Sequence, residues 1–110
     1  MPSLAEMAAI CRRVGDRLGQ GEPTYHTLAE LATVLIFLAG WLDREVARLP
    51  DRRTEEKQGW QRQLQAVRAS LLPFGQSGAP ADTEALRAAV VGAQAAVSSL
   101  IGAMQREAPG

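Results

Sequence analysis

The sequence contains one cysteine and one histidine, Cys11 and His26, and this scarcity excludes most disulfide and metal chemistry. A single cysteine cannot form a disulfide within the chain. One cysteine and one histidine also fall short of the ligands that a zinc or di-iron site takes from a helical bundle. We therefore expect no metal and no cofactor, and 110 residues are enough to bury a core without either.

The chain also lacks net charge and a long uncharged segment. Twelve basic residues balance 12 acidic ones, so no overall field attracts nucleic acid or anionic lipid. The longest uncharged apolar run, residues 31–42, lies between Glu30 and Asp43, whereas crossing a bilayer takes about 20 mostly apolar residues. We therefore expect neither a nucleic-acid nor a membrane partner. The N-terminus lacks the basic residues of a secretory signal, which predicts a cytoplasmic protein.

No catalytic motif is present either. The glycines of residues 15–21 lack the lysine and the preceding strand of a phosphate-binding loop. Cys11 falls on the apolar seam of its predicted helix, so it is expected to be a buried small hydrophobe rather than a nucleophile. These absences favour a non-enzymatic protein.

The dominant feature that is present is the apolar segment 28–49. Its main stripe recurs at steps of three and four residues, which is typical of one helix face, and comprises Leu28, Leu31, Leu35, Leu38, Leu42, Val46 and Leu49. A second strip, Val34, Phe37 and Trp41, lies about 100° round the helix, and Ile36 and Gly40 lie on the opposite flank. The helix is therefore apolar nearly all round, and other helices of this chain or of a second copy must enclose it.

Three further helices are predicted, so that the four span roughly residues 3–18, 25–49, 52–72 and 82–106 of a single domain. Two capping boxes support the first two helix starts, Ser3 to Glu6 and Thr27 to Glu30, and Asp82 is a plausible N-cap for the fourth helix. Pro73 begins a loop after the third helix. Short connections between consecutive helices predict an all-α, antiparallel up-down-up-down four-helix bundle.

The fourth predicted helix is rich in alanine, glycine and serine. Small side chains let helix axes approach closely, so we expect the bulky second helix to lie against it. The first helix is much shorter than the second and fourth, which would leave part of the long pair without a neighbour in one chain. We therefore predict a homodimer or higher oligomer that buries Ile36, Phe37, Gly40 and Trp41, with another protein as a further potential partner.

Three functions compete at this stage. The first is a non-enzymatic interaction protein, acting as an oligomeric scaffold, adaptor or regulator through an apolar helix face. The second is a small-molecule pocket between helices, lined by Tyr25, His26, Trp41 and Trp60.

The third function follows from a resemblance. The segment 26–31, HTLAEL, resembles the histidine motif of histidine phosphotransfer domains, which are helical bundles of about this size. The resemblance implies that His26 is a phosphoacceptor. The segment has Ala29 and Glu30 where that family has a lysine and a glycine.

Overall fold

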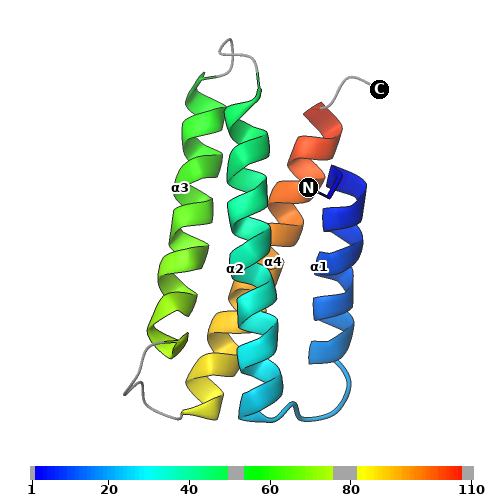
Figure 1. The fold of residues 1–110 in the computed structure, drawn as a ribbon, viewed down its shortest axis with the longest axis vertical. Coiled ribbons are helices and arrows are strands. Elements are labelled where there is room, and N and C mark those ends of the chain that lie inside the picture. The colour runs from blue at the N-terminus through cyan, green and yellow to red at the C-terminus, as the bar shows by residue number, and fades with distance from the viewer. Residues whose placement is uncertain (1, 50–53, 76–81, 108–110) are drawn as a thin grey trace.

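In the computed structural model, residues 2–49, 54–75 and 82–107 are described, and they form an all-α four-helix bundle (Figure 1). The helices are α1 (Leu4–Leu18), α2 (Tyr25–Ala47), α3 (Thr54–Leu71) and α4 (Thr83–Glu107). A short 3-10 helix, η2 (Leu72–Gly75), extends α3. Consecutive helices run in opposite directions, which confirms the predicted up-down-up-down bundle.

The helix starts follow local capping chemistry, and α2 begins at residue 25 as predicted but with a different capping residue. Ser3 Oγ accepts a hydrogen bond from the Glu6 backbone N–H at 3.1 Å, which confirms the predicted cap of α1. Helix α2 is capped by Thr24 and not by Thr27, because Thr24 is extended and its Oγ1 accepts from the Thr27 N–H at 3.2 Å. The cap predicted at Thr27 was therefore wrong by one turn, and His26 belongs to the first turn of α2.

The other helix ends agree closely with the sequence pattern. Asp82 Oδ1 accepts from the Ala85 N–H at 3.1 Å, so Asp82 caps α4 as predicted. Helix α2 ends two residues before the predicted end at Leu49. The predicted start of α3 at residue 52 lies outside the described residues, and Pro73 lies in the turn of η2 where a loop was expected to begin.

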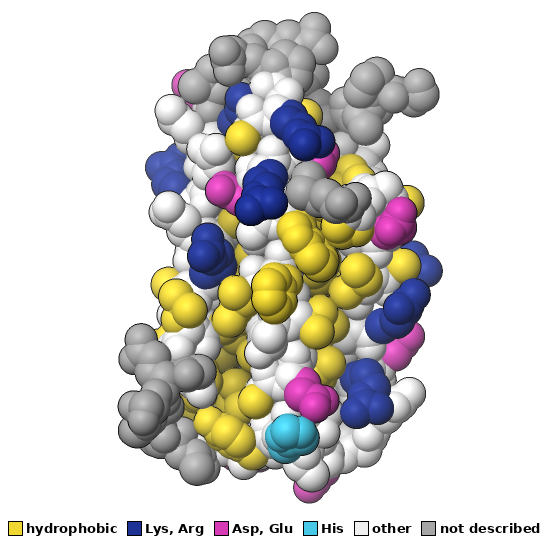
Figure 2. All heavy atoms as spheres, viewed as in Figure 1, with side chains coloured by type: hydrophobic (Ala, Val, Ile, Leu, Met, Phe, Trp, Pro, Cys, Tyr) yellow, Lys and Arg dark blue, Asp and Glu magenta, His cyan; other side chains and the backbone are white. Residues whose placement is uncertain are grey.

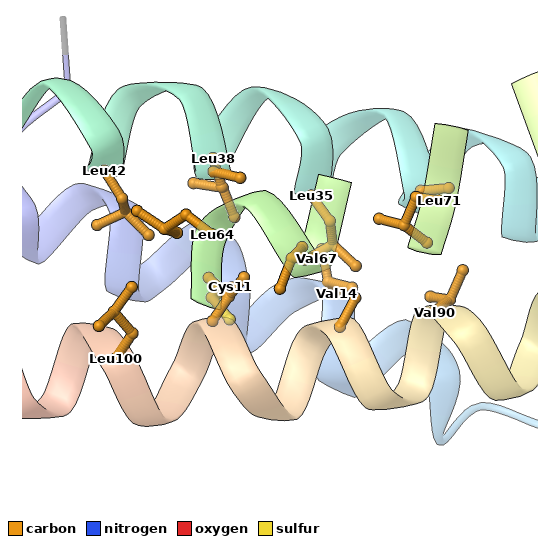
Figure 3. Packing of buried hydrophobic residues seen from close by; sticks show 14 of the residues in the cluster. Cys11, Val14, Leu35, Leu38, Leu42, Leu64, Val67, Leu71, Val90 and Leu100 are labelled. Carbon is orange, nitrogen blue, oxygen red and sulfur yellow. The ribbon is translucent and has the colours of Figure 1, made fainter. Parts of the chain in front are cut away.

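The core is the predicted stripe of α2, except Leu49, which follows the end of the helix and is half-buried, surrounded by the apolar seams of the other helices (Figure 3). Leu35, Leu38 and Leu42 are completely inaccessible to solvent. Opposite them lie Leu64 of α3 and Leu100 of α4, also buried. Each fully buried leucine contributes about 1.5–3 kcal/mol through removal of its apolar surface from water, so this stripe fixes the rotation of α2 about its own axis.

Helix α2 packs extensively on α3 and on α4, whereas α1 packs mainly on α4 and only slightly on α2. The predicted contact between α2 and α4 is confirmed, but the expected reason for it is only partly correct. Of the small residues of α4, Ala93 is buried and Ala89 and Ala96 pack against the core margin. Most others are exposed, because larger buried residues such as Val90 and Val97 make the core side of the helix.

Helices α2 and α4 are each long and apolar enough to cross a membrane, judged by length and composition alone. Core helices of water-soluble proteins pass the same test. The absence of a membrane partner stays a prediction.

Candidate functional site

The candidate site is an apolar surface on the outer side of α2, formed by Val34, Ile36, Phe37, Gly40 and Trp41 and called here the α2 patch. The Phe37 side chain is 59% exposed, the highest value among the large hydrophobic residues that the structure describes. Its ring lies 6.1 Å from that of Trp41, centroid to centroid, with the planes tilted by 31°. Figure 2 shows hydrophobic side chains gathered over α2 in the middle of this face of the molecule.

The rotation of α2 explains why this surface faces water. Leu35 points into the core, and each residue turns the helix by about 100°, so Phe37 emerges on the opposite side. Val34 and Ile36 emerge on the two flanks and are half-buried against the margins of the core. Phe37 therefore cannot enter the core of one chain unless the buried leucine stripe leaves it.

Gly40 leaves a gap beside Phe37 on the same surface. A Cβ atom built on Gly40 would meet nothing within 4 Å, so no contact within one chain requires a glycine here. Glycine in a helix interior costs about 0.8–1 kcal/mol relative to alanine. The position is open to a partner side chain.

Charged side chains flank the α2 patch along the helix. Toward the N-terminus, His26 Nε2 lies 3.1 Å from Glu30 Oε1, and these side chains are 85% and 62% exposed. Toward the C-terminus, Arg48 Nη1 lies 3.3 Å from Glu45 Oε1. Arg44 is exposed between them and forms no ion pair with the part of the chain that the structure describes. The exposed charged side chains are thus Glu30 before the patch and Arg44 and Arg48 after it, whereas Asp43 and Glu45 after the patch are half-buried.

The aromatic residues predicted to line a pocket are not brought together. Tyr25 and His26 lie in the first turn of α2, and at about 1.5 Å per residue Trp41 lies about 24 Å further along that helix. Trp60 lies in the first half of α3, which begins at the end of the bundle opposite the start of α2. The described grooves between α1 and α4 and between α3 and α4 are lined by other residues.

His26 is exposed, as access by a phosphodonor would require, but its surroundings oppose that chemistry. The Glu30 carboxylate takes the position next to Nε2 at 3.1 Å. A phosphoryl group on Nε2 would lie beside this like charge, which is destabilising. The geometry favours an ordinary helix-surface pair of a histidine and a glutamate one turn apart.

A polar groove of about 390 Å³ lies between α1 and α4, with Arg12, Asp16 and Gln94 in its lining. Gln94 Nε2 donates to the Cys11 backbone carbonyl at 3.3 Å, and the Cys11 thiol donates to the Gln94 backbone carbonyl at 3.7 Å. Burial raises the pKa of the Cys11 thiol, although the hydrogen bond from Gln94 partly opposes this shift. Cys11 is buried, as predicted, and its raised pKa disfavours the reactive thiolate.

Sequence reasoning missed the role of Gln94, because its partner Cys11 is 83 positions away and polar residues between alanines look like ordinary helix surface.

Among the described residues, no group of three or more histidine, cysteine, aspartate or glutamate side chains is placed to hold a metal ion. No family model, curated protein or solved structure matches the chain.

Proposed function

We propose that this chain is a non-enzymatic helical interaction protein that associates with a second copy through the α2 patch, and so serves as an oligomeric scaffold, adaptor or regulator. The observation that carries the proposal is the exposure of Phe37, the most exposed of the large hydrophobic residues described, with its ring beside that of Trp41. Buried aromatic side chains contribute strongly to protein interfaces because they remove a large area from water at a small entropic cost.

Other exposed apolar side chains are smaller or more isolated than Phe37, and the groove between α3 and α4 is lined mainly by alanine and glycine. Leu72 and Val91 are 48% and 46% exposed, but they lie on η2 and α4 rather than on α2. Single exposed hydrophobic residues are normal, whereas contiguous patches mark interaction sites. The α2 patch is therefore the surface from which association is expected.

A second copy suits this surface better than a bilayer does. His26, Glu30 and Arg44 are exposed on the same side of α2 as Phe37, so immersion of the patch in hydrocarbon would carry charged groups with it. A protein partner covers the apolar centre and leaves the charged ends at a polar rim, which is the ordinary anatomy of an interface.

The test is the mass of the full chain in solution, measured by sedimentation velocity at micromolar concentration. The wild-type chain is expected to be a dimer or larger. Phe37→Glu is expected to yield monomers with unchanged helicity, because Phe37 makes no part of the buried core. Val91→Glu places the same charge at an exposed hydrophobic position on α4 and is expected to leave the mass unchanged.

Three results would overturn the proposal. They are a monomeric wild-type chain, a dimer that Phe37→Glu does not weaken, and a chain that floats with neutral phospholipid vesicles through the α2 patch. Turnover of a substrate that depends on His26 or Cys11 would contradict its non-enzymatic part.

A further inference from the structure

We infer that the two copies pair α2 against α2 in antiparallel orientation, related by a twofold axis that passes between the two helices, perpendicular to both, at the level midway between Phe37 and Gly40. This inference rests on the proposed function and specifies the arrangement of the partner. It follows from the order of charges along the exposed side of α2, together with the position of the one gap in its apolar centre.

The charges are complementary only when the helices run in opposite directions. At about 1.5 Å per residue, Glu30 lies about 13 Å from such an axis, and Arg44 and Arg48 lie about 8 Å and about 14 Å from it on the other side. The twofold therefore places Glu30 of one copy between Arg44 and Arg48 of the other, and repeats this contact at the opposite end. Their long side chains span the remaining separation.

A parallel pair would have the opposite electrostatics. It would align Glu30 with Glu30 and Arg44 with Arg44, and like charges opposite each other disfavour an interface. Glu30 and Arg48 keep their contacts with His26 and Glu45 within each copy, and exposed pairs of this kind are weak enough to be shared. Arg44, which has no such contact in the described structure, is the residue with the most to gain from the second copy.

The apolar centre fits the same axis. Residues 37 and 40 exchange places across it, so the exposed ring of Phe37 faces the open position at Gly40 of the second copy. A twofold perpendicular to both helices also brings the same flank of each together. Val34 then lies near Trp41 of the second copy, which extends the apolar contact on that side.

Charge reversal tests the orientation in the full-length chain. The single variant Glu30→Arg is expected to raise the dimer dissociation constant about tenfold. The double variant with Arg44→Glu and Arg48→Glu is expected to raise it by a similar factor. In both variants, attractive contacts at the two ends of the interface become repulsive. Combining all three substitutions is expected to restore the dissociation constant to within about threefold of wild type. Glu84→Arg on α4 and Arg68→Glu on α3 are matched reversals at exposed positions and are expected to have no effect.

A parallel dimer would give a different pattern. Glu30→Arg would replace one like-charged pair by another, and so would the double variant with Arg44→Glu and Arg48→Glu. Neither variant would then weaken the dimer, and the combined variant would show no recovery of the dissociation constant. That pattern would overturn the orientation while leaving the proposed function intact. A monomeric wild-type chain would instead overturn both.

Cross-linking provides a second measurement that does not depend on charge. A chain with Glu30→Cys, mixed with a chain with Arg44→Cys, is expected to form a disulfide-linked heterodimer under mild oxidation. Two copies of Glu30→Cys alone would be about 26 Å apart along the axis and are expected not to cross-link. Cross-linking of Glu30→Cys with itself and not with Arg44→Cys would exclude the antiparallel pair.

Discussion

Gln94 on α4 donates its side-chain N–H to the backbone carbonyl of Cys11 on α1, at 3.3 Å. The Cys11 thiol donates in return to the Gln94 backbone carbonyl at 3.7 Å. Gly15 makes the approach possible, since a Cβ atom there would lie 2.9 Å from Gln94 Nε2. These contacts connect α1 to α4, the helix on which it mainly packs.

A double-mutant cycle tests this arrangement. Gln94→Ala is expected to lower the free energy of unfolding by about 1 kcal/mol through loss of the hydrogen bond. Gly15→Ala alone is expected to be nearly neutral, because the gain of about 1 kcal/mol in helix propensity is offset by displacement of Gln94. In the Gln94→Ala background the same change should be stabilising by about 1 kcal/mol, as measured by urea denaturation. Equal effects of Gly15→Ala in both backgrounds would contradict the contact.

The buried thiol of Cys11 predicts a dependence of stability on pH. Its pKa is raised in the folded chain, so between the unfolded and the folded pKa the unfolded state binds fewer protons than the folded state. The free energy of unfolding is therefore fully retained below the ordinary thiol pKa and falls as pH rises above it. Cys11→Ala is expected to remove this slope, which chemical denaturation at a series of alkaline pH values measures. An unchanged slope in Cys11→Ala would assign it to other groups.

The buried stripe could be predicted from the sequence because it depends on a repeat within one helix. Leu28, Leu35 and Leu42 are all completely buried, as their spacing predicts. The contact of Gln94 with Cys11 could not be predicted in this way, since it depends on the relative height of two helices. The exposed small residues of α4 show the same limit, because a sequence does not state which side of an alanine-rich helix meets its neighbour.

The start of α2 at residue 25 agrees with the predicted span, but the cap predicted at Thr27 is wrong for a local reason. Thr27 and Glu30 match the capping-box pattern, whereas Thr24 has Thr27 rather than a glutamate three residues later. The extended backbone at Thr24 nevertheless brings its hydroxyl within 3.2 Å of the Thr27 N–H, so the earlier threonine satisfies that donor. The sequence pattern correctly predicted that a helix starts in this segment, but it assigned the N-cap to Thr27 instead of Thr24.

This difference gives a direct test. Thr24→Ala is expected to lower the free energy of unfolding by about 1 kcal/mol, because it removes the acceptor for the Thr27 N–H. Thr27→Ala is the matched control and is expected to change it little, since Thr27 lies inside the helix and alanine is the better helix former. Thermal denaturation followed by circular dichroism compares the two. A larger effect at Thr27 would return the cap to the position that the sequence pattern suggested.

Gly40 and Gly59 form a matched pair that separates stability from association. A Cβ atom at either position would meet nothing within 4 Å in one chain. Alanine at either position is therefore expected to stabilise the monomer by about 1 kcal/mol, measured by denaturation at a concentration where dimers have dissociated.

Leucine at the same two positions tests association. Gly40→Leu is expected to weaken the dimer, because its side chain would occupy the gap that receives Phe37 of the second copy. Gly59→Leu on α3 is expected to leave association unchanged. Equal association of the two leucine variants would place the interface away from Gly40, even if both alanine variants behave as expected.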